Sequence, residues 1–227
     1  MLRHALLVVS ALAMVVAGAA HAVAQTCSGL PAIGENSKGN IGANLGISSA
    51  TVGIGANVTL GSYHSFGTFE IGKTNYTEFE FTRTIVGLTL GGQFDLGRTR
   101  PISICPVVNG SGEWASDLNS AGLSYSTDLI TGGGHVGFIL YTNNRRDIVP
   151  TLGLTMGRLR DTLAIPGQRE TQKDTISVLT LGVGFVFDKR LAIRPAVIKR
   201  FGVQGVPGLP GSPATVSVIG TFAFGHR

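Results

Sequence analysis

Period-two alternation of apolar residues with small or polar ones is the feature that most constrains the fold of this chain. It is clearest in residues 175–200, where an apolar face runs from Leu179 to Val197 and is interrupted only by the polar residues 188–190. Alternation on both sides of a three-residue polar turn predicts an antiparallel hairpin. Its other face would hold small, polar and cationic residues, with Arg194 opposite Gly184. Such a hairpin is typical of strands between lipid and a polar lumen.

The same alternation recurs along most of the chain and predicts ten strands, with eight as the alternative. The candidate runs are residues 41–47, 52–60, 63–73, 82–94, 101–114, 127–141, 148–158, 175–187, 191–200 and 215–224. Their connections alternate between short turns (60–63, 95–100, 142–147, 188–190) and longer polar loops (76–80, 113–126, 161–173, 205–213). Short turns at one end and long loops at the other predict an all-β, antiparallel, up-and-down transmembrane β-barrel.

The N-terminal residues have the composition of a secretory signal peptide. Leu2-Arg3-His4 is a basic head, residues 5–17 are almost wholly apolar, and Ala20-His21-Ala22 is an A-x-A cleavage site. We therefore expect residues 1–22 to be removed, residues 23–38 to form an irregular segment, and residues 39–225 to form the barrel. No later segment has 18 consecutive apolar residues, so a closed barrel is the way the mature chain would cross a membrane.

Two cysteines, Cys27 and Cys105, follow the expected cleavage site. An even pair in an exported chain favours a disulfide. Cys105 lies on the non-apolar face of its strand near a short turn, and the 12 residues between Cys27 and Gly39 can fold back that far. We therefore predict that a Cys27–Cys105 bridge holds the N-terminal segment in the periplasmic mouth of the barrel.

Charged residues on the non-apolar faces predict the character of the lumen. They are Glu70, Arg83, Glu113, Arg194 and Arg200. Glu70 and Arg83 lie on consecutive strands and are expected close together if the turn between them centres on residues 77–78. Buried charges are expected in pairs, so the interior is predicted to be ion-paired and filled, with a small charged pore as the alternative.

Aromatic residues end the strands that lead into the short turns. Phe94, Tyr141, Phe187 and Phe224 would share one level and form an interfacial aromatic girdle. Pro106, Pro150 and Pro195 lie within alternating runs, where each would remove a ladder donor. Bulges at one level are one explanation for these prolines.

The sequence contains no recognisable pattern of catalytic residues. His64, His135 and His226 lie on separate elements without metal-ligand spacing, and there is no G-x-S-x-G motif. We therefore expect no enzyme activity, no cofactor and no metal. The formal charge of +5 is spread along the chain without a basic stripe, so nucleic acid is not an expected partner.

The cleaved signal, strands such as Leu181-Gly182-Val183-Gly184-Phe185 and the last alternating strand resemble the small bacterial outer-membrane β-barrel proteins. The resemblance covers roughly residues 39–225. It implies that Phe222 and Phe224 are the signal read by the outer-membrane assembly machinery, although here Gly225-His226-Arg227 follows the final aromatic.

The resulting expectation is a monomer in the lipid of the outer membrane of a Gram-negative-type cell. Its expected role is structural or surface-interacting, through the loops at 113–126, 161–173 and 205–213. The alternatives are a narrow porin-like channel for small solutes and a secreted soluble β-barrel that binds a small apolar ligand.

Overall fold

The computed structural model describes residues 27, 37–62, 64–76, 81–96, 102–118, 123–142, 146–165, 167–202 and 214–225. These residues form strands and turns. The strands are β1 (Gly39–Ile47), β2 (Thr51–Gly61), β3 (Ser65–Tyr76), β4 (Phe81–Gly92), β5 (Phe94–Leu96), β6 (Ile102–Leu118), β7 (Leu123–Phe138), β8 (Tyr141–Thr142), β9 (Arg146–Ile165), β10 (Gln168–Phe187), β11 (Leu191–Phe201) and β12 (Thr215–Phe224). The expected signal peptide and most of the irregular segment lie outside the described residues.

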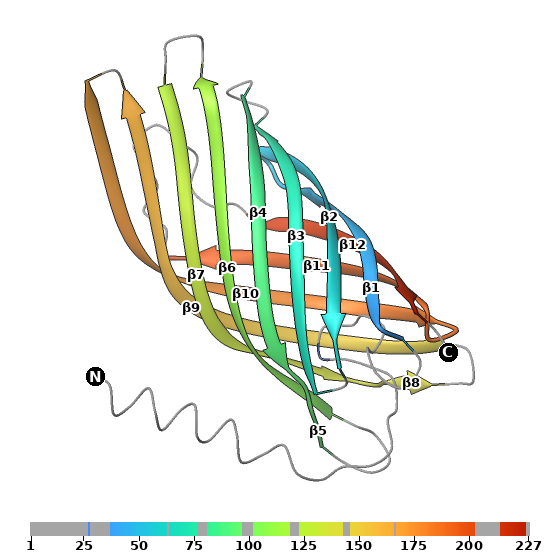
Figure 1. Cartoon of the computed structure of the whole chain (residues 1–227). Coiled ribbons are helices and arrows are strands. Elements are labelled where there is room, and N and C mark those ends of the chain that lie inside the picture. The colour runs from blue at the N-terminus through green and yellow to red at the C-terminus, as the bar shows by residue number, and fades with distance from the viewer. Residues whose placement is uncertain are drawn as a thin grey trace, which may run out of the picture.

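Antiparallel pairing of neighbouring strands closes the sheet into a barrel (Figure 1). The closing contact is between the first and last strands, where Gly39 pairs with Phe224 and Ile47 with Val216. The short strand β5 pairs with β6, as β4 does, and the short strand β8 pairs with β9, as β7 does. Strands β5 and β8 therefore continue β4 and β7. The barrel therefore has ten strands, as predicted from the alternation.

The stagger of the strands sets the width of the barrel. We follow paired residues around the barrel from Ile193 in β11. The path passes through β12, β1 and the following strands in turn, and it arrives at Lys173 in β10. The direct partner of Ile193 in β10 is Phe185, and 185 − 173 gives a stagger of 12 residues. Ten strands with this stagger tilt by roughly 40° and enclose a barrel roughly 20 Å across between backbones.

The barrel wall is much taller on one side than on the other. Strands β9 and β10 have 20 residues each, whereas β1 has 9 and β12 has 10. In Figure 1 the hairpins of β6 with β7 and of β9 with β10 both rise at the end away from the start of β1 and the end of β12. We call this end of the barrel the far end and the opposite end, where β1 begins and β12 ends, the terminal end.

The tall side corrects the loop boundaries expected from sequence. Most of the expected loops at 113–126 and 161–173 are strand, since β6 pairs with β7 as far as Leu118 and Leu123, and β9 pairs with β10 as far as Ile165 and Gln168. Both faces of these extensions carry polar residues, so no apolar–polar alternation reveals them, while backbone hydrogen bonds still hold the ladder together. The expected loop at 205–213 lies outside the described residues.

The three prolines within strands do not produce bulges. Pro106 pairs with Gly134, Pro150 with Val183 and Pro195 with Val218, and the register on either side of each pair is continuous. All three lie on the outward face of the barrel. The bulge hypothesis for these residues is therefore wrong.

Candidate functional site

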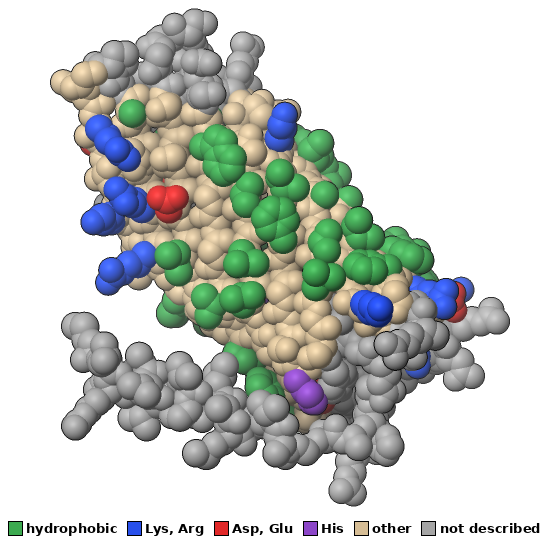
Figure 2. Space-filling model, viewed as in Figure 1, with side chains coloured by type: hydrophobic (Ala, Val, Ile, Leu, Met, Phe, Trp, Pro, Cys, Tyr) green, Lys and Arg blue, Asp and Glu red, His purple; other side chains and the backbone are tan. Residues whose placement is uncertain are grey.

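The outer face of the barrel is apolar, the reverse of an ordinary globular surface (Figure 2). Large apolar side chains on every long strand are exposed there, including Ile54, Ile130, Leu154 and Val216 at 64, 67, 48 and 53%. The described apolar residues that are buried are mostly small or medium in size. Soluble monomers rarely expose contiguous apolar patches larger than a few hundred Å², so this face is built to be covered.

The apolar band has a clear upper edge. On β9 the outward residues are apolar from Ile148 to Met156, a span of roughly 20 Å along the barrel axis at the estimated tilt. Beyond that point the outward residues are the exposed cations Arg158 and Arg160, and Lys173 pairs with Arg160 from β10. Figure 2 shows Lys and Arg side chains gathered beside the tall wall, next to the apolar band.

The inner face encloses a chamber of about 390 Å³. Strands β1 to β6 supply it with a mostly polar wall whose side chains bond to one another. Asn44 Nδ2 donates to Glu70 Oε1 over 2.6 Å. Thr89 Oγ1 donates to Asn109 Oδ1 over 2.8 Å, and Asn109 Nδ2 donates to Thr131 Oγ1 over 3.1 Å. This wall therefore satisfies much of its own hydrogen-bonding capacity.

A second part of the chamber is less polar. It follows the lumen face of β11 and its two neighbours, where Val178, Ala196, Ile198 and Ile219 lie together with the small polar residues Thr180 and Ser217. The strip begins beside Arg194, which pairs with Ile219, and ends beside Arg200, which pairs with Val178. The chamber thus combines a polar wall with a narrow apolar strip that has an arginine at each end.

Paired charges form a layer at the far end of the lumen, which we call the far layer: Tyr76, Arg83, Glu113, Tyr125, Asp161 and Arg200. Arg83 Nη1 lies 3.4 Å from Glu113 Oε2, and Arg200 Nη2 lies 3.9 Å from Glu113 Oε1. The guanidinium of Arg83 also lies between two rings, 4.3 Å from the centre of Tyr76 and 4.1 Å from that of Tyr125. This buried cation therefore has both an ion pair and cation–π partners.

Asp161 extends the far layer on the tall side of the wall. Its Oδ1 accepts hydrogen bonds from Tyr125 Oη over 2.6 Å and from Thr127 Oγ1 over 2.7 Å. Tyr125 thus contacts Arg83 with its ring and Asp161 with its hydroxyl. The far layer is a connected network across the lumen.

Glu70 and Arg83 do not meet, contrary to the sequence-based expectation. Glu70 lies opposite Gly87 in the β3–β4 ladder, whereas Arg83 lies opposite Thr74. The reason is register, because the ladder centres between residues 78 and 79 and so shifts the two side chains apart. Glu113 is the acid that pairs with Arg83, and Asn44 is the neighbour of Glu70.

At the terminal end of the chamber lies a different group, which we call the terminal cluster: His135, Thr151, Arg194 and Thr221. Arg194 is 7% exposed, and no carboxylate of the described residues lies within 4 Å of it. Its Nε lies 3.1 Å, and Thr151 Oγ1 lies 3.0 Å, from the position that a Cβ on Gly182 would take. Gly182 therefore provides the space for the guanidinium that the sequence suggested for Gly184.

Unpaired polar atoms are concentrated in the terminal cluster. Arg194 Nε, His135 Nδ1, Thr151 Oγ1 and Thr221 Oγ1 are buried and have no hydrogen-bond partner among the described residues. The His135 ring occupies the space above Gly153, two residues from Thr151 on the same face of β9. Thr221 pairs with Ala192, next to Arg194 on the lumen face of β11.

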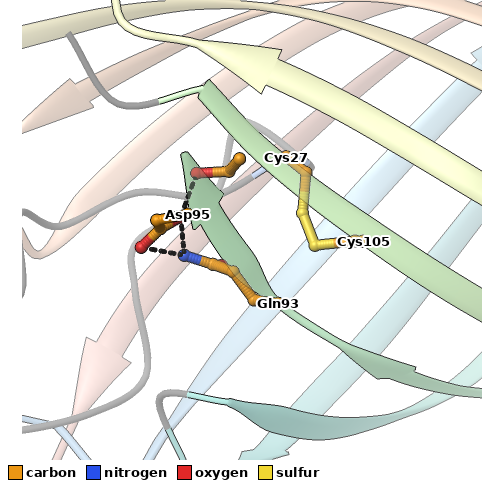
Figure 3. Close-up of a disulfide and its surroundings, with 5 residues drawn as sticks. Cys27, Gln93, Asp95 and Cys105 are labelled. Carbon is orange, nitrogen blue, oxygen red and sulfur yellow. Dashed lines mark hydrogen bonds between the residues drawn. A yellow bond between two sulfur atoms is a disulfide. The ribbon is translucent and has the colours of Figure 1, made fainter. Parts of the chain in front are cut away.

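The predicted disulfide is present and lies at the terminal end of the lumen (Figure 3). Cys27 and Cys105 are fully buried and form a small apolar cluster with Val107 and Phe66. Beside them, Ser103 Oγ and Gln93 Nε2 donate hydrogen bonds to Asp95. Burial raises the pKa of the Asp95 carboxyl, and the hydrogen bond from Ser103 offsets part of this rise.

The aromatic residues expected to form a girdle lie at the strand ends of the terminal end. Phe94, Phe187 and Phe224 are half-buried there, while the side chain of Tyr141 lies outside the described side chains. Phe222 is 50% exposed and faces outward from β12.

Several residues that meet in the lumen were not predicted from the sequence to contact one another. They are Tyr76, Tyr125, Asp161, His135 and Thr151. Their phase on the strands could have placed them inside, but only the register reveals which of them meet.

Within the described ranges, no group of three or more His, Cys, Asp or Glu side chains is placed to hold a metal ion. That part of the chain also lacks any helix long and apolar enough to span a membrane.

Comparisons with known proteins find similar solved structures but no matching family. No family model and no curated protein matches the sequence. Among solved structures, the chain is similar to the CymD monoaromatic hydrocarbon channel at 7% identity, over 85% of this chain and 90% of that one, with a TM-score of 0.29. It is also similar to the P. putida toluene transporter TodX at 12% identity, over 85% of this chain and 68% of that one, with a TM-score of 0.26. At these TM-scores the likeness carries no argument about function.

Proposed function

We propose that this chain is an integral outer-membrane β-barrel. The observation that supports this is the inverted distribution of side chains, with large apolar residues outside and polar residues inside. The outward apolar band is close to the height of roughly 25 Å found in such barrels, and charged residues begin at its edge. The expected signal peptide, the monomeric state and assembly through Phe222 and Phe224 belong to the same proposal.

A direct test of the membrane assignment is the behaviour of the purified protein. The folded barrel should require detergent and should migrate faster on a gel when unheated than after boiling. A protein that stays monomeric in buffer without detergent would contradict the proposal and would revive the soluble-barrel alternative.

Within the membrane, we propose that the barrel is a narrow channel for small polar solutes. The observation that carries this is the chamber of about 390 Å³ in the lumen of the closed barrel, between the far layer and the disulfide. A fully filled interior would leave no such space. Because much of the lining is Asn, Thr, Ser, Glu and Arg, we propose polar or charged solutes, without any catalytic step or cofactor.

Planar-bilayer recording tests the channel directly. Wild-type protein should give small discrete conductance steps, and Asn109→Trp should reduce them because Asn109 faces the chamber. Val108→Trp is the matched control, since Val108 is 57% exposed on the outward face and should leave conductance unchanged. Folded protein without conductance, or equal effects of the two variants, would contradict the channel.

A structural or surface-interacting role is the second candidate, and the tall wall favours it. The β9–β10 ladder continues from Arg158 and Thr175 to Ile165 and Gln168, beyond the outward apolar residues. A rigid polar hairpin of this kind can present a surface outside the membrane. If folded wild-type protein does not conduct, this role becomes the better account of the chain.

A further inference from the structure

Arg194 is a buried cation for which the described residues supply no counter-charge. It is 7% exposed, lines the chamber, and has no carboxylate within 4 Å among the described residues. Burial of an unpaired charge costs several kcal/mol in general, so such groups are retained where they have a partner or a function. The other lumen arginines both contact Glu113.

The neighbours of Arg194 can donate hydrogen bonds to an anion. Thr151 Oγ1 shares the space above Gly182 with the Arg194 guanidinium. Thr151, Thr221 and His135 each have a buried polar atom without a partner in the described part of the chain. A hydroxyl can turn its hydrogen toward an acceptor, and an imidazole nitrogen can carry a proton. A guanidinium binds a carboxylate through two parallel hydrogen bonds.

The apolar strip starts where this group of donors ends. Ile219 lies directly opposite Arg194, and Ala196 and Ile198 follow Arg194 along the lumen face of β11. From Arg194 to Ile198 the strand advances by roughly 13 Å. An anionic group held at Arg194 would therefore place an attached apolar body along the strip.

We propose that the chamber binds small organic acids, with the carboxylate at Arg194 and the apolar body along Ala196, Ile198 and Ile219. This inference rests on the proposed channel only in that the ligand must reach the lumen. It assigns the solute class, amphipathic monoanions, to a lumen whose far arginines are already paired. Inorganic anions lack the apolar body, and neutral hydrocarbons lack the group that Arg194 binds.

Calorimetric titration of the detergent-solubilised, disulfide-intact protein tests the site with benzoate as the probe. Benzoate should bind with measurable heat, and its neutral analogue benzamide and inorganic phosphate should bind more weakly. Arg194→Gln should weaken benzoate binding by at least about tenfold, since a hydrogen-bonded charge is lost. Arg158→Gln, which removes an outward-facing cation, should leave the affinity unchanged.

Two further variants separate loss of the site from loss of the fold. Gly182→Ala keeps every charge but places a methyl group about 3.1 Å from Arg194 Nε, so it should also weaken binding. Arg194→Lys should restore part of the affinity. Heat-modifiable migration on a gel shows which variants are folded.

Three results would overturn the proposal. They are the absence of benzoate binding, equal affinity for benzoate and benzamide, and no loss of affinity in folded Arg194→Gln, whether or not Arg200→Gln loses it. Failure of this inference is distinguishable from failure of the channel. Conductance without benzoate binding removes only the assignment of the solute class, whereas binding without conductance removes only the channel.

Discussion

Arg83 and Arg194 are both buried arginines in the lumen of one barrel, yet their surroundings are opposite. Arg83 lies 3.4 Å from Glu113 and between the rings of Tyr76 and Tyr125. Among the described residues, no carboxylate lies within 4 Å of Arg194, which lies among buried polar atoms without partners at the terminal end of the chamber. Arg83 stabilises the barrel through these contacts. The burial of Arg194 lowers the stability of the barrel, and a bound anion can offset that loss. The same residue type thus serves structure in one layer and recognition in the other.

The largest expected effect is the loss of Glu113. Glu113→Gln leaves Arg83 without its carboxylate and also removes the contact with Arg200. Removing one partner of a buried pair costs roughly 3–5 kcal/mol, and the side chains here are largely but not wholly buried, so we expect about 3 kcal/mol. Urea unfolding in lipid vesicles measures this change. Glu170→Gln, at an exposed position on β10, is the control and should have almost no effect.

Removal of the disulfide is the next largest change, and it acts at the terminal end. The bridge closes a loop with a sequence separation of 78. Cys27→Ser with Cys105→Ser should lower the free energy of unfolding by about 2–4 kcal/mol. It should also raise conductance, because Cys27 would no longer be held in the lumen at the terminal end. Unchanged stability and conductance would show that the bridge neither ties nor closes the barrel.

Replacement of Arg194 should have the opposite sign to replacement of Arg83. Arg194→Met removes an unpaired buried charge and should raise the free energy of unfolding by roughly 1–3 kcal/mol. Arg83→Met removes a paired cation and should lower it. Both variants are measured by the same urea titration in the absence of organic acids. A loss of stability in both variants would erase the contrast between the two layers.

The smallest expected effect concerns Asp95 at the terminal mouth. Burial raises the pKa of its carboxyl in the folded state, so its contribution to stability is present below the unfolded value of about 3.8 and is lost as pH rises through the folded value. Asp95→Asn should therefore gain stability relative to wild type between acidic and neutral pH. Melting temperatures of both proteins across that range provide the measurement. A constant difference at every pH would contradict the shift.

The sequence predicts some parts of this molecule far better than others. Ten runs of alternating residues become ten strands. Within the apolar band, every second residue of a strand faces lipid and the others face the lumen, so the sequence alternates between apolar and small or polar residues. Above that band the contrast disappears, so the alternation could not predict that most of residues 161–173 would be strand. The disulfide was predictable from export and from the phase of Cys105.

The contacts between lumen side chains were less predictable from the sequence than the strand faces on which these side chains lie. The phase of each strand places Glu70, Arg83, Glu113, Arg194 and Arg200 on the non-apolar side. Which of them meet depends on register, and the stagger of 12 residues brings together side chains from strands that are distant in sequence. Glu70 and Arg83 show this dependence, since a small shift in one ladder replaced their expected contact with two others.

The sequence by itself determined the alternating strands, the inward and outward faces and the pair of cysteines, because these depend on local periodicity and on residue type. Tertiary structure alone decided that Arg83 is paired with Glu113 and that Arg194 has no carboxylate within 4 Å in the described part of the chain. In the sequence the two arginines are equivalent, as each is a cation on the non-apolar face of a strand. Their difference arises from barrel closure, which sets the neighbours of each guanidinium across several strands and leaves a chamber between the two layers.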